Sequence, residues 1–191
     1  MTTKRTPLEI FQTPLGVLNY PWVNSPDTRY NPTGVYQTKI SMSLEAAQDL
    51  IAQMERIRDA EFAKLDPQKS ATYTKKDVYE LEFSQPAADA TEAEKEAFVP
   101  EPTGNVVFKA KLNAVVQPKE GDSFTQTPIL IDADEAPVTL PIWSGTKAQL
   151  RGQIQPWSNA AQKQVGVTLR LKALKVFELV TGEGSTWGSF D

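Results

Sequence analysis

The chain has 191 residues, a formal net charge of −4, and neither cysteine nor histidine. These absences exclude disulfide bonds, thiolate metal sites and Ser–His or Cys–His catalysis, so an enzyme would depend on carboxylates, lysine, tyrosine or a cofactor. The polar N-terminus lacks the apolar region of a signal peptide, and no apolar run is long enough to span a membrane. We therefore expect a soluble intracellular protein, with one domain over residues 1–180 and a short tail over 181–191.

The pattern of apolar and polar residues predicts a sequence of strands with one helix. In chain order, we expect an extended segment over 8–23, a turn over 25–32, a strand over 34–42, an amphipathic helix over about 43–66, and strands at 77–83, 105–116, 128–132, 146–155 and 164–179. Ser43 is expected to cap the helix and Pro67 to end it. Residues 156–163 are expected to form a loop.

Alternating strands of this kind indicate an antiparallel sheet with one solvent-exposed face. The elements fit a mainly β protein with an OB-fold, which is a five-stranded antiparallel Greek-key barrel, here with one inserted amphipathic helix. A β-sandwich is the structural alternative. Residues 84–104, rich in Ala, Pro and Glu, are expected to form a flexible acidic insertion with a helical turn near 90–97.

The charges are segregated along the chain. Residues 136–177 contain no Asp or Glu and six Lys or Arg, whereas residues 80–101 contain seven acids and one Lys. A chain with negative net charge can therefore still present a basic face, although the acid-free stretch could also arise by chance in strands.

The outward positions of the expected strands carry Lys or Arg, and aromatic residues lie at strand ends and in loops. Cations can follow the phosphates of a single DNA strand, and aromatic faces can accept its unstacked bases. The candidate DNA-binding residues are Trp157, Trp143, Trp22, Tyr36, Lys39, Lys109, Lys111, Lys147, Arg151, Arg170 and Lys172. The ordinary alternative for each is a surface lysine or a core aromatic residue.

Metal and phosphate motifs are weak. Asp132, Asp134 and Glu135 supply oxygen ligands, but they lack the glycine and the glutamate spacing of a calcium loop, so a solvated turn is expected. The sequence Gly182-x-Gly184 lacks the Lys-Ser of a phosphate loop. We expect no metal and no cofactor.

The order of several motifs resembles the single-stranded DNA-binding proteins of short-tailed, T7-like bacteriophages. The matching segments are Thr13-Pro-Leu-Gly16, Asn31-Pro-Thr-Gly-Val-Tyr-Gln37 with the helix after it, Val107-Phe-Lys-Ala-Lys111, and the block from Pro141 through Gln155-Pro-Trp157 and Gly166–Leu171 to Leu179. Together they cover about two-thirds of the chain. No single motif is diagnostic, but their order and spacing are informative.

The resemblance implies an OB-fold that binds single-stranded DNA without base preference in the cytoplasm of an infected bacterial host. It implies a non-enzymatic role in phage DNA replication, recombination and repair, by coating and protecting single strands and promoting annealing. The family's stacking aromatic falls on Trp157, and its basic strand residues fall on Lys109 and Lys111. A replication polymerase or helicase, bound through the tail, and a second copy of the chain are the implied protein partners.

One departure concerns the C-terminus. The family ends in a long acidic tail with a terminal aromatic residue, whereas residues 182–191 here keep Trp187, Phe190 and Asp191 but few acids. Tail-mediated dimerisation and polymerase recruitment are therefore in doubt. Two other functions stay open, namely a β-barrel that binds protein or saccharide instead of DNA, and an enzyme that uses a pair of carboxylates.

Overall fold

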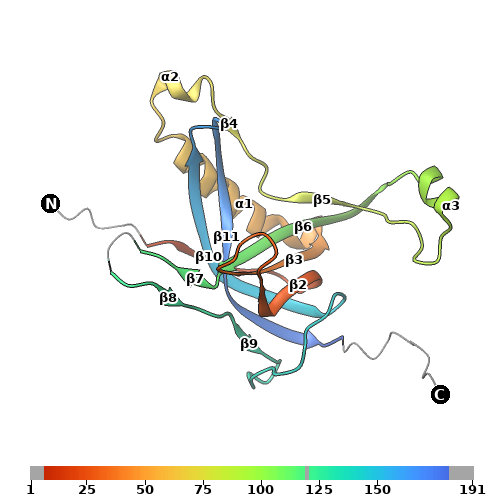
Figure 1. Cartoon of the computed structure of the whole chain (residues 1–191). Helices are drawn as coiled ribbons and strands as arrows, with labels where there is room; N and C mark the ends of the chain where they lie inside the picture. The colour runs from red at the N-terminus through yellow and green to blue at the C-terminus, as the bar shows by residue number, and fades with distance from the viewer. Residues whose placement is uncertain (1–6, 119–120, 181–191) are drawn as a thin grey trace, which may run out of the picture.

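The structure, a computed structural model, describes residues 7–118 and 121–180, which form eleven strands and three helices (Figure 1). The long strands are β2 Gly16–Asp27, β3 Val35–Ser43, β6 Pro102–Asn113, β10 Lys147–Asn159 and β11 Gln164–Glu178. The short strands are β1 Glu9–Gln12, β4 Thr74–Lys75, β5 Glu80–Phe83, β7 Val115–Val116, β8 Phe124–Thr125 and β9 Ile129–Ile131. The helices are α1 Leu44–Phe62, α2 Pro67–Ser70 and α3 Glu92–Ala97. The predicted tail, residues 181–191, lies outside the described residues.

The five long strands form a closed ring of pairings. β2 pairs with β3, β3 with β6, β6 with β11, β11 with β10, and β10 again with β2. The last contact consists of two residue pairs, Lys147 with Val17 and Ala148 with Gly16. The ring places one face of each strand toward a shared core and the other face outward.

The prediction of a five-stranded antiparallel sheet is wrong in two respects. In the described residues the main sheet has nine strands, because four short strands pair with strands of the ring: β1 with β10, β5 with β6, and β4 and β9 with β11. It also contains parallel pairings, since β11 runs parallel to β4, β6 and β9. The prediction of a mainly β protein with an inserted helix is confirmed.

The alternation predicted from the sequence decides which side chains fill the core. Ile40 and Met42 of β3, Phe108 of β6, and Leu150 and Ile154 of β10 are all buried. Burying one Leu, Ile or Phe side chain stabilises a fold by about 1.5–3 kcal/mol, so this inward row is the main source of stability. The outward positions of the same strands remain free to bind a partner.

Helix α1 closes the core on one side. Ser43 caps it as predicted, accepting a hydrogen bond from the backbone N–H of Ala46, and its buried face packs against β3, β6, β10 and β11. The predicted end was wrong, because the helix stops at Phe62 and Pro67 begins α2 instead. Proline is favoured in the first turn of a helix, because a backbone N–H at that position would have no hydrogen-bond partner within the helix.

The predicted loop over residues 156–163 was also wrong. β10 continues through Pro156 and Trp157 to Asn159, and the turn before β11 is short. β1 covers the other edge of β10 only from Arg151 to Ile154, so no described strand pairs with Pro156 there. A proline is tolerated at such a free edge. β2 likewise extends to Asp27, into the predicted turn.

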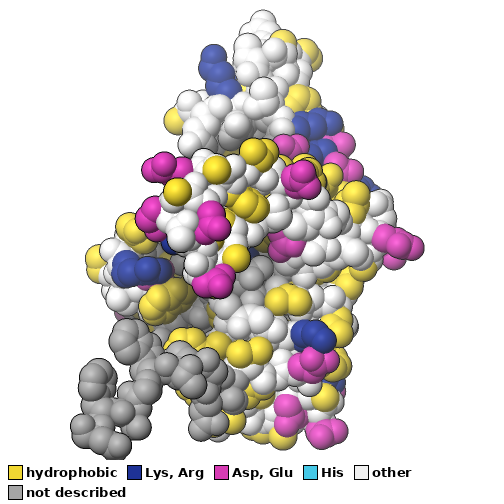
Figure 2. Space-filling model, turned by 90° about the vertical axis from the view of Figure 1, so that its right-hand side faces the viewer, with side chains coloured by type: hydrophobic (Ala, Val, Ile, Leu, Met, Phe, Trp, Pro, Cys, Tyr) yellow, Lys and Arg dark blue, Asp and Glu magenta, His cyan; other side chains and the backbone are white. Residues whose placement is uncertain are grey.

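The acidic segment forms an arm. Figure 1 shows the chain leaving β5, forming α3 and returning to β6 at a distance from the rest of the sheet. A capping box joins Thr91 and Glu94 at the start of α3, which agrees with the helical turn predicted near 90–97. We call residues 84–101 the acidic arm, and Figure 2 shows Asp and Glu side chains gathered on the side of the molecule to which it projects.

Candidate nucleic-acid interface

Strand register brings cations from separate parts of the sequence onto one outward face. Gln153 of β10 pairs with Arg170 of β11, Arg170 pairs with Lys111 of β6, and Lys111 pairs with Gln37 of β3. Residues paired across a sheet point to the same side. Neighbouring strands lie about 4.8 Å apart, so these side chains form a continuous row.

Three further cations extend this row. Lys109 lies two residues before Lys111 on β6 and pairs with Lys39 of β3. Lys172 follows Arg170 by two residues on β11, while Arg151 of β10 pairs with Ala173. We call Lys109, Lys111, Arg151, Arg170 and Lys172 the cationic face.

The members of the cationic face share a property that the other candidate cations lack. Among the described residues, no carboxylate lies within ion-pair distance of any of these five side chains. Lys39, in contrast, contacts Glu80 at 2.8 Å, and Lys147 contacts Glu178 at 2.9 Å. An unpaired cation can bind a phosphate without first breaking an ion pair.

Electrostatics within the cationic face favour an anionic partner. Burial lowers the pKa of Lys172, and the nearby positive charge of Arg170 lowers it further. Like charges held together in this way repel each other in the free protein. A phosphate placed between them would relieve that repulsion.

A groove runs beside Lys109 and Lys111. It has a volume of about 840 Å³ and lies between residues 76–83 on one side and β6 and β11 on the other. Its lining mixes the cations Lys76, Lys109 and Lys111 with the acids Glu55, Asp77 and Glu80, and it also includes Tyr79, Leu81 and Phe83. The sequence did not indicate that residues 76–83 line a groove, because no local pattern shows that this segment folds back over β6.

Trp157 lies on the outward side of β10, in the strand and not in a loop. It pairs with Gly166 of β11, and its indole lies so close that a Cβ atom added to Gly166 would be 2.4 Å from Cζ2 of the ring. The side chain is half-buried. Gly166 therefore lets the indole lie against the sheet, with part of the side chain still accessible.

Two other predicted residues lie elsewhere. Tyr36 is only 7% exposed and belongs to the core, so it is removed from the candidate set. Trp143 is 52% exposed, in the turn before β10, next to Lys147. Lys147 and Trp157 are ten residues apart on one strand, which at about 3.3 Å per residue places them roughly 30 Å from each other. Lys147 is also paired with Glu178 at 2.9 Å, so we do not include Trp143 and Lys147 in the cationic face.

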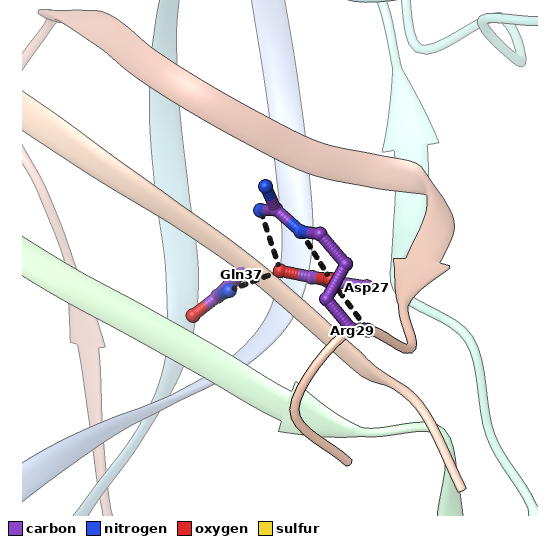
Figure 3. A network of polar contacts seen from close by, with 3 residues as sticks. All are labelled: Asp27, Arg29 and Gln37. Atoms are coloured by element: carbon purple, nitrogen blue, oxygen red, sulfur yellow. Dashed lines mark hydrogen bonds and ion pairs between the residues drawn. The ribbon is translucent and has the colours of Figure 1, made fainter. Parts of the chain in front are cut away.

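Trp22 stands at the β2 end of the face, next to a polar network of Asp27, Arg29 and Gln37. Figure 3 shows this network. Trp22 of β2 pairs with Gln37, the last residue of the row described above. Asp27 accepts hydrogen bonds from Nε and Nη2 of Arg29 at 3.0 and 2.9 Å, and from Nε2 of Gln37 at 3.1 Å. The Arg29 guanidinium lies 4.9 Å from the centre of the Trp22 ring.

Arg29 and Tyr30 lie in this cluster but are not among the candidate residues named from the sequence. The signal was present in Asp27, because an aspartate in a turn commonly accepts the backbone N–H two residues on, as Asp27 does from Arg29 at 3.0 Å. That pattern locates the turn, but it does not show that the Arg29 side chain folds back over Trp22.

The other candidate sites have ordinary explanations. One Asp132 carboxylate oxygen accepts the backbone N–H groups of Asp134 and Ala136 at 2.9 Å each, so it stabilises a turn. Within residues 7–118 and 121–180, no group of acidic side chains is arranged to hold a metal ion. No helix in that part of the chain has the length and apolar character needed to cross a membrane.

Comparison with solved structures identifies the fold. The chain is similar to gp2.5, a single-stranded DNA-binding protein encoded by bacteriophage T7, with 18% identity over 97% of this chain and 99% of that one, at a TM-score of 0.66. It is also similar to the single-stranded DNA-binding protein of bacteriophage Enc34 in complex with single-stranded DNA, with 13% identity over 94% and 89% of the two chains, at a TM-score of 0.53. A C-terminal truncation of the Enc34 protein matches at 12% identity over 88% and 85%, with a TM-score of 0.52.

Sequence comparison alone does not identify a relative. No protein-family model matches the chain, and no curated protein matches it. The similarity therefore lies in the backbone arrangement, and it extends over nearly the whole chain. The protein has the fold of the bacteriophage single-stranded DNA-binding proteins.

Proposed function

We propose that this protein binds single-stranded DNA without base preference and acts in phage DNA replication, recombination and repair by coating and protecting single strands and promoting annealing. The observation that carries the proposal is a row of cations, Lys109, Lys111 and Arg170, that have no ion-pair partner among the described residues and share an outward face with Trp157. Phosphates would follow the cations, and an unstacked base would lie against the indole.

The proposed recognition has little means of reading a base sequence. Duplex recognition commonly places a helix or a β-ribbon in the major groove. Here α1, the long helix of the described residues, packs its apolar side on the sheet. Stacking on an aromatic ring accepts any base, and lysines bind phosphates irrespective of sequence.

The closed ring of five strands supports the finer proposal that residues 1–180 form an OB-fold barrel elaborated by α1 and by the arm between β5 and β6. The parallel contact of β6 with β11 closes the ring, as a Greek-key path requires. Dimerisation, recruitment of a polymerase or helicase through residues 181–191, and action in the host cytoplasm are further parts of the proposal, and they rest on the resemblance of the sequence motifs described above.

A DNA-free protein-interaction module is the second candidate, since exposed apolar side chains such as Leu81 and Phe83 line the groove. The cationic face favours DNA, because five unpaired cations repel one another unless an anionic partner binds. We also propose that the protein is not an enzyme, given a chain without histidine or cysteine and neighbours that are DNA-binding proteins.

Competition between single-stranded and duplex DNA tests the proposed function. We expect a fluorescent oligo-dT to be displaced by unlabelled single strands of any composition, and only weakly by a duplex of equal length. Equal displacement by the duplex would contradict the proposal. Absence of any oligo-dT binding at low salt would favour the protein-interaction module instead.

A further inference from the structure

Arg29 is held in one orientation by its neighbours. Its Nε and Nη2 atoms donate to separate oxygens of Asp27, at 3.0 and 2.9 Å, and its backbone N–H donates to Oδ1 at 3.0 Å. Asp27 is buried, and Gln37 of β3 donates a further hydrogen bond to it. Figure 3 shows the guanidinium, from the turn after β2, and the Gln37 amide, from β3, converging on this one carboxylate. The paired contact of a planar guanidinium with a carboxylate fixes the plane of the arginine as well as its position.

The ion pair also limits what Arg29 can do. The side-chain hydrogen bonds from Arg29 lower the pKa of Asp27 from 3.8 to about 2, so the carboxylate is ionised at every pH near neutrality. Its negative charge offsets the positive charge of Arg29, which weakens the attraction of this arginine for phosphate. What remains available is the flat surface of the guanidinium.

Two aromatic rings lie next to that surface. The Arg29 Cζ atom lies 4.9 Å from the centre of the Trp22 ring and 5.9 Å from the centre of the Tyr30 ring. Tyr30 is 92% exposed, and the Arg29 side chain is 60% exposed. Three planar groups thus gather on the surface, and aromatic rings and guanidinium planes are the groups on which proteins stack unpaired bases.

The position of this cluster relates it to the cationic face. Trp22 pairs with Gln37, Gln37 with Lys111, and Lys111 with Arg170. The cluster therefore lies at the β2 end of the row of cations, and Trp157 lies near its β10 end. Four strand-to-strand steps of about 4.8 Å make a path of roughly 19 Å around the surface of the ring from Trp22 to Gln153, across the cations that would bind the intervening phosphates.

We propose that Trp22, Arg29 and Tyr30 form a second base-stacking site, in which Arg29 presents its plane to a base and Asp27 acts as a positioning residue for Arg29. The site rests on the proposed binding of single-stranded DNA and adds to it a second, separate contact for bases. It differs from a phosphate site, because the shape of the guanidinium matters more than its charge.

Two probes of equal length separate stacking from phosphate binding. One is oligo-dT, and the other is an abasic oligonucleotide that carries the same phosphates without bases. We expect Arg29→Lys to weaken binding of oligo-dT about tenfold, since a lysine keeps the charge but loses the plane and the forked contact with Asp27. Binding of the abasic probe should stay within about twofold of the wild type. Arg56→Lys, at an arginine of α1 that makes the same kind of forked contact with a carboxylate, that of Glu9, outside the cationic face, is the matched control and should leave both affinities unchanged.

Tyr30→Ala is a second variant that we expect to fold normally, because the Tyr30 side chain is almost fully exposed. It should also weaken oligo-dT binding selectively. Asp27→Asn should weaken oligo-dT binding while abasic binding stays constant or rises, which simple loss of stability cannot produce. Equal losses on both probes for Arg29→Lys would reassign Arg29 as a phosphate contact and overturn the proposal, as would no loss for both Arg29→Lys and Tyr30→Ala. If the wild type binds neither probe, the proposed function itself fails.

Discussion

The two ends of β10 carry the same kinds of residue but differ in how those residues are partnered. In the half of β10 that carries Trp157, from Gln153 onward, β11 and β6 present Arg170, Lys111 and Lys109 without an ion-pair partner among the described residues. At the other end, Trp143 has Lys147 beside it, but Lys147 is paired with Glu178. Lys175 is similarly paired with Glu135 at 3.5 Å. Residue type alone makes both ends plausible DNA sites, and ion pairing distinguishes them.

Reversing charges at each end should show the largest effect. In the double variant Lys109→Glu with Lys111→Glu, we expect a loss of about 3 kcal/mol in oligo-dT binding, at about 1.5 kcal/mol for each charged contact. The control is the charge reversal Lys147→Glu with Lys175→Glu at the other end of β10. It changes the net charge equally and should lose less than a third as much binding free energy. Fluorescence anisotropy measures both. Equal losses would mean that overall charge, and not the cationic face, attracts the DNA.

The two tryptophans provide the next comparison. Trp157→Ala should cost about 1–3 kcal/mol of binding, whereas Trp143→Ala should cost almost nothing. Gly166→Ala keeps Trp157 but places a Cβ atom 2.4 Å from its ring, so the indole must move off the sheet. We expect this variant to lose binding as Trp157→Ala does, with an altered tryptophan emission spectrum. A large fall in melting temperature with normal affinity in Trp157→Ala would instead make Trp157 a packing residue.

Much of the fold could be predicted from local pattern. The alternation of Ile40, Met42 and Phe108 with polar neighbours correctly gave the inward faces of β3 and β6, and Ser43 correctly marked the start of α1. Pro156 led to the wrong expectation of a loop over residues 156–163. Proline usually breaks a strand, and the sequence does not show that this edge of β10 is free.

The candidate site was less accessible to sequence reasoning. Lys109 and Lys111 follow from alternation within β6, but their alignment with Arg170 depends on a pairing between strands about sixty residues apart. Tyr36 was named as a DNA-binding candidate, but it lies on the buried side of β3, which is incompatible with stacking on a base. The ion pairs of Lys39 and Lys147, and the Arg29 cluster, depend on tertiary contacts that no local pattern records.

Lys39 allows a smaller test of the role of ion pairing. It lies beside Lys109 on the cationic side, but Glu80 holds it at 2.8 Å, and both side chains are partly exposed. Glu80→Gln should free Lys39 and strengthen oligo-dT binding by at most about 1 kcal/mol, the usual range for an exposed pair. The same change in the partner of Lys147, Glu178→Gln, should leave the affinity for oligo-dT unchanged. Weaker binding in Glu80→Gln would show that Glu80 supports the site instead of competing with DNA.

The smallest expected effect is the response of the Arg29 cluster to pH. Because folding lowers the pKa of Asp27 from 3.8 to about 2, its ionised form stabilises the folded state above pH 3.8. That contribution falls as the pH drops from about 4 toward 2. Thermal melts of the wild type and Asp27→Asn should therefore differ by a constant amount from pH 7 to about 4 and converge below it. A difference that changes between pH 7 and 5 would contradict this assignment.

The salt dependence of oligo-dT binding, followed by tryptophan fluorescence, tests the central claim most directly. If the cationic face binds roughly four to six phosphates, the log–log plot of affinity against salt should have a slope of about −3 to −4, at about −0.7 per contact. Lys109→Glu with Lys111→Glu should reduce the magnitude of that slope by about 1.4. The predicted result is that DNA quenches the tryptophan fluorescence of the wild type with an affinity that follows this salt slope, and that the variant has a shallower slope. A flat salt response, or the same slope in both proteins, would contradict the assignment of single-stranded DNA to this face.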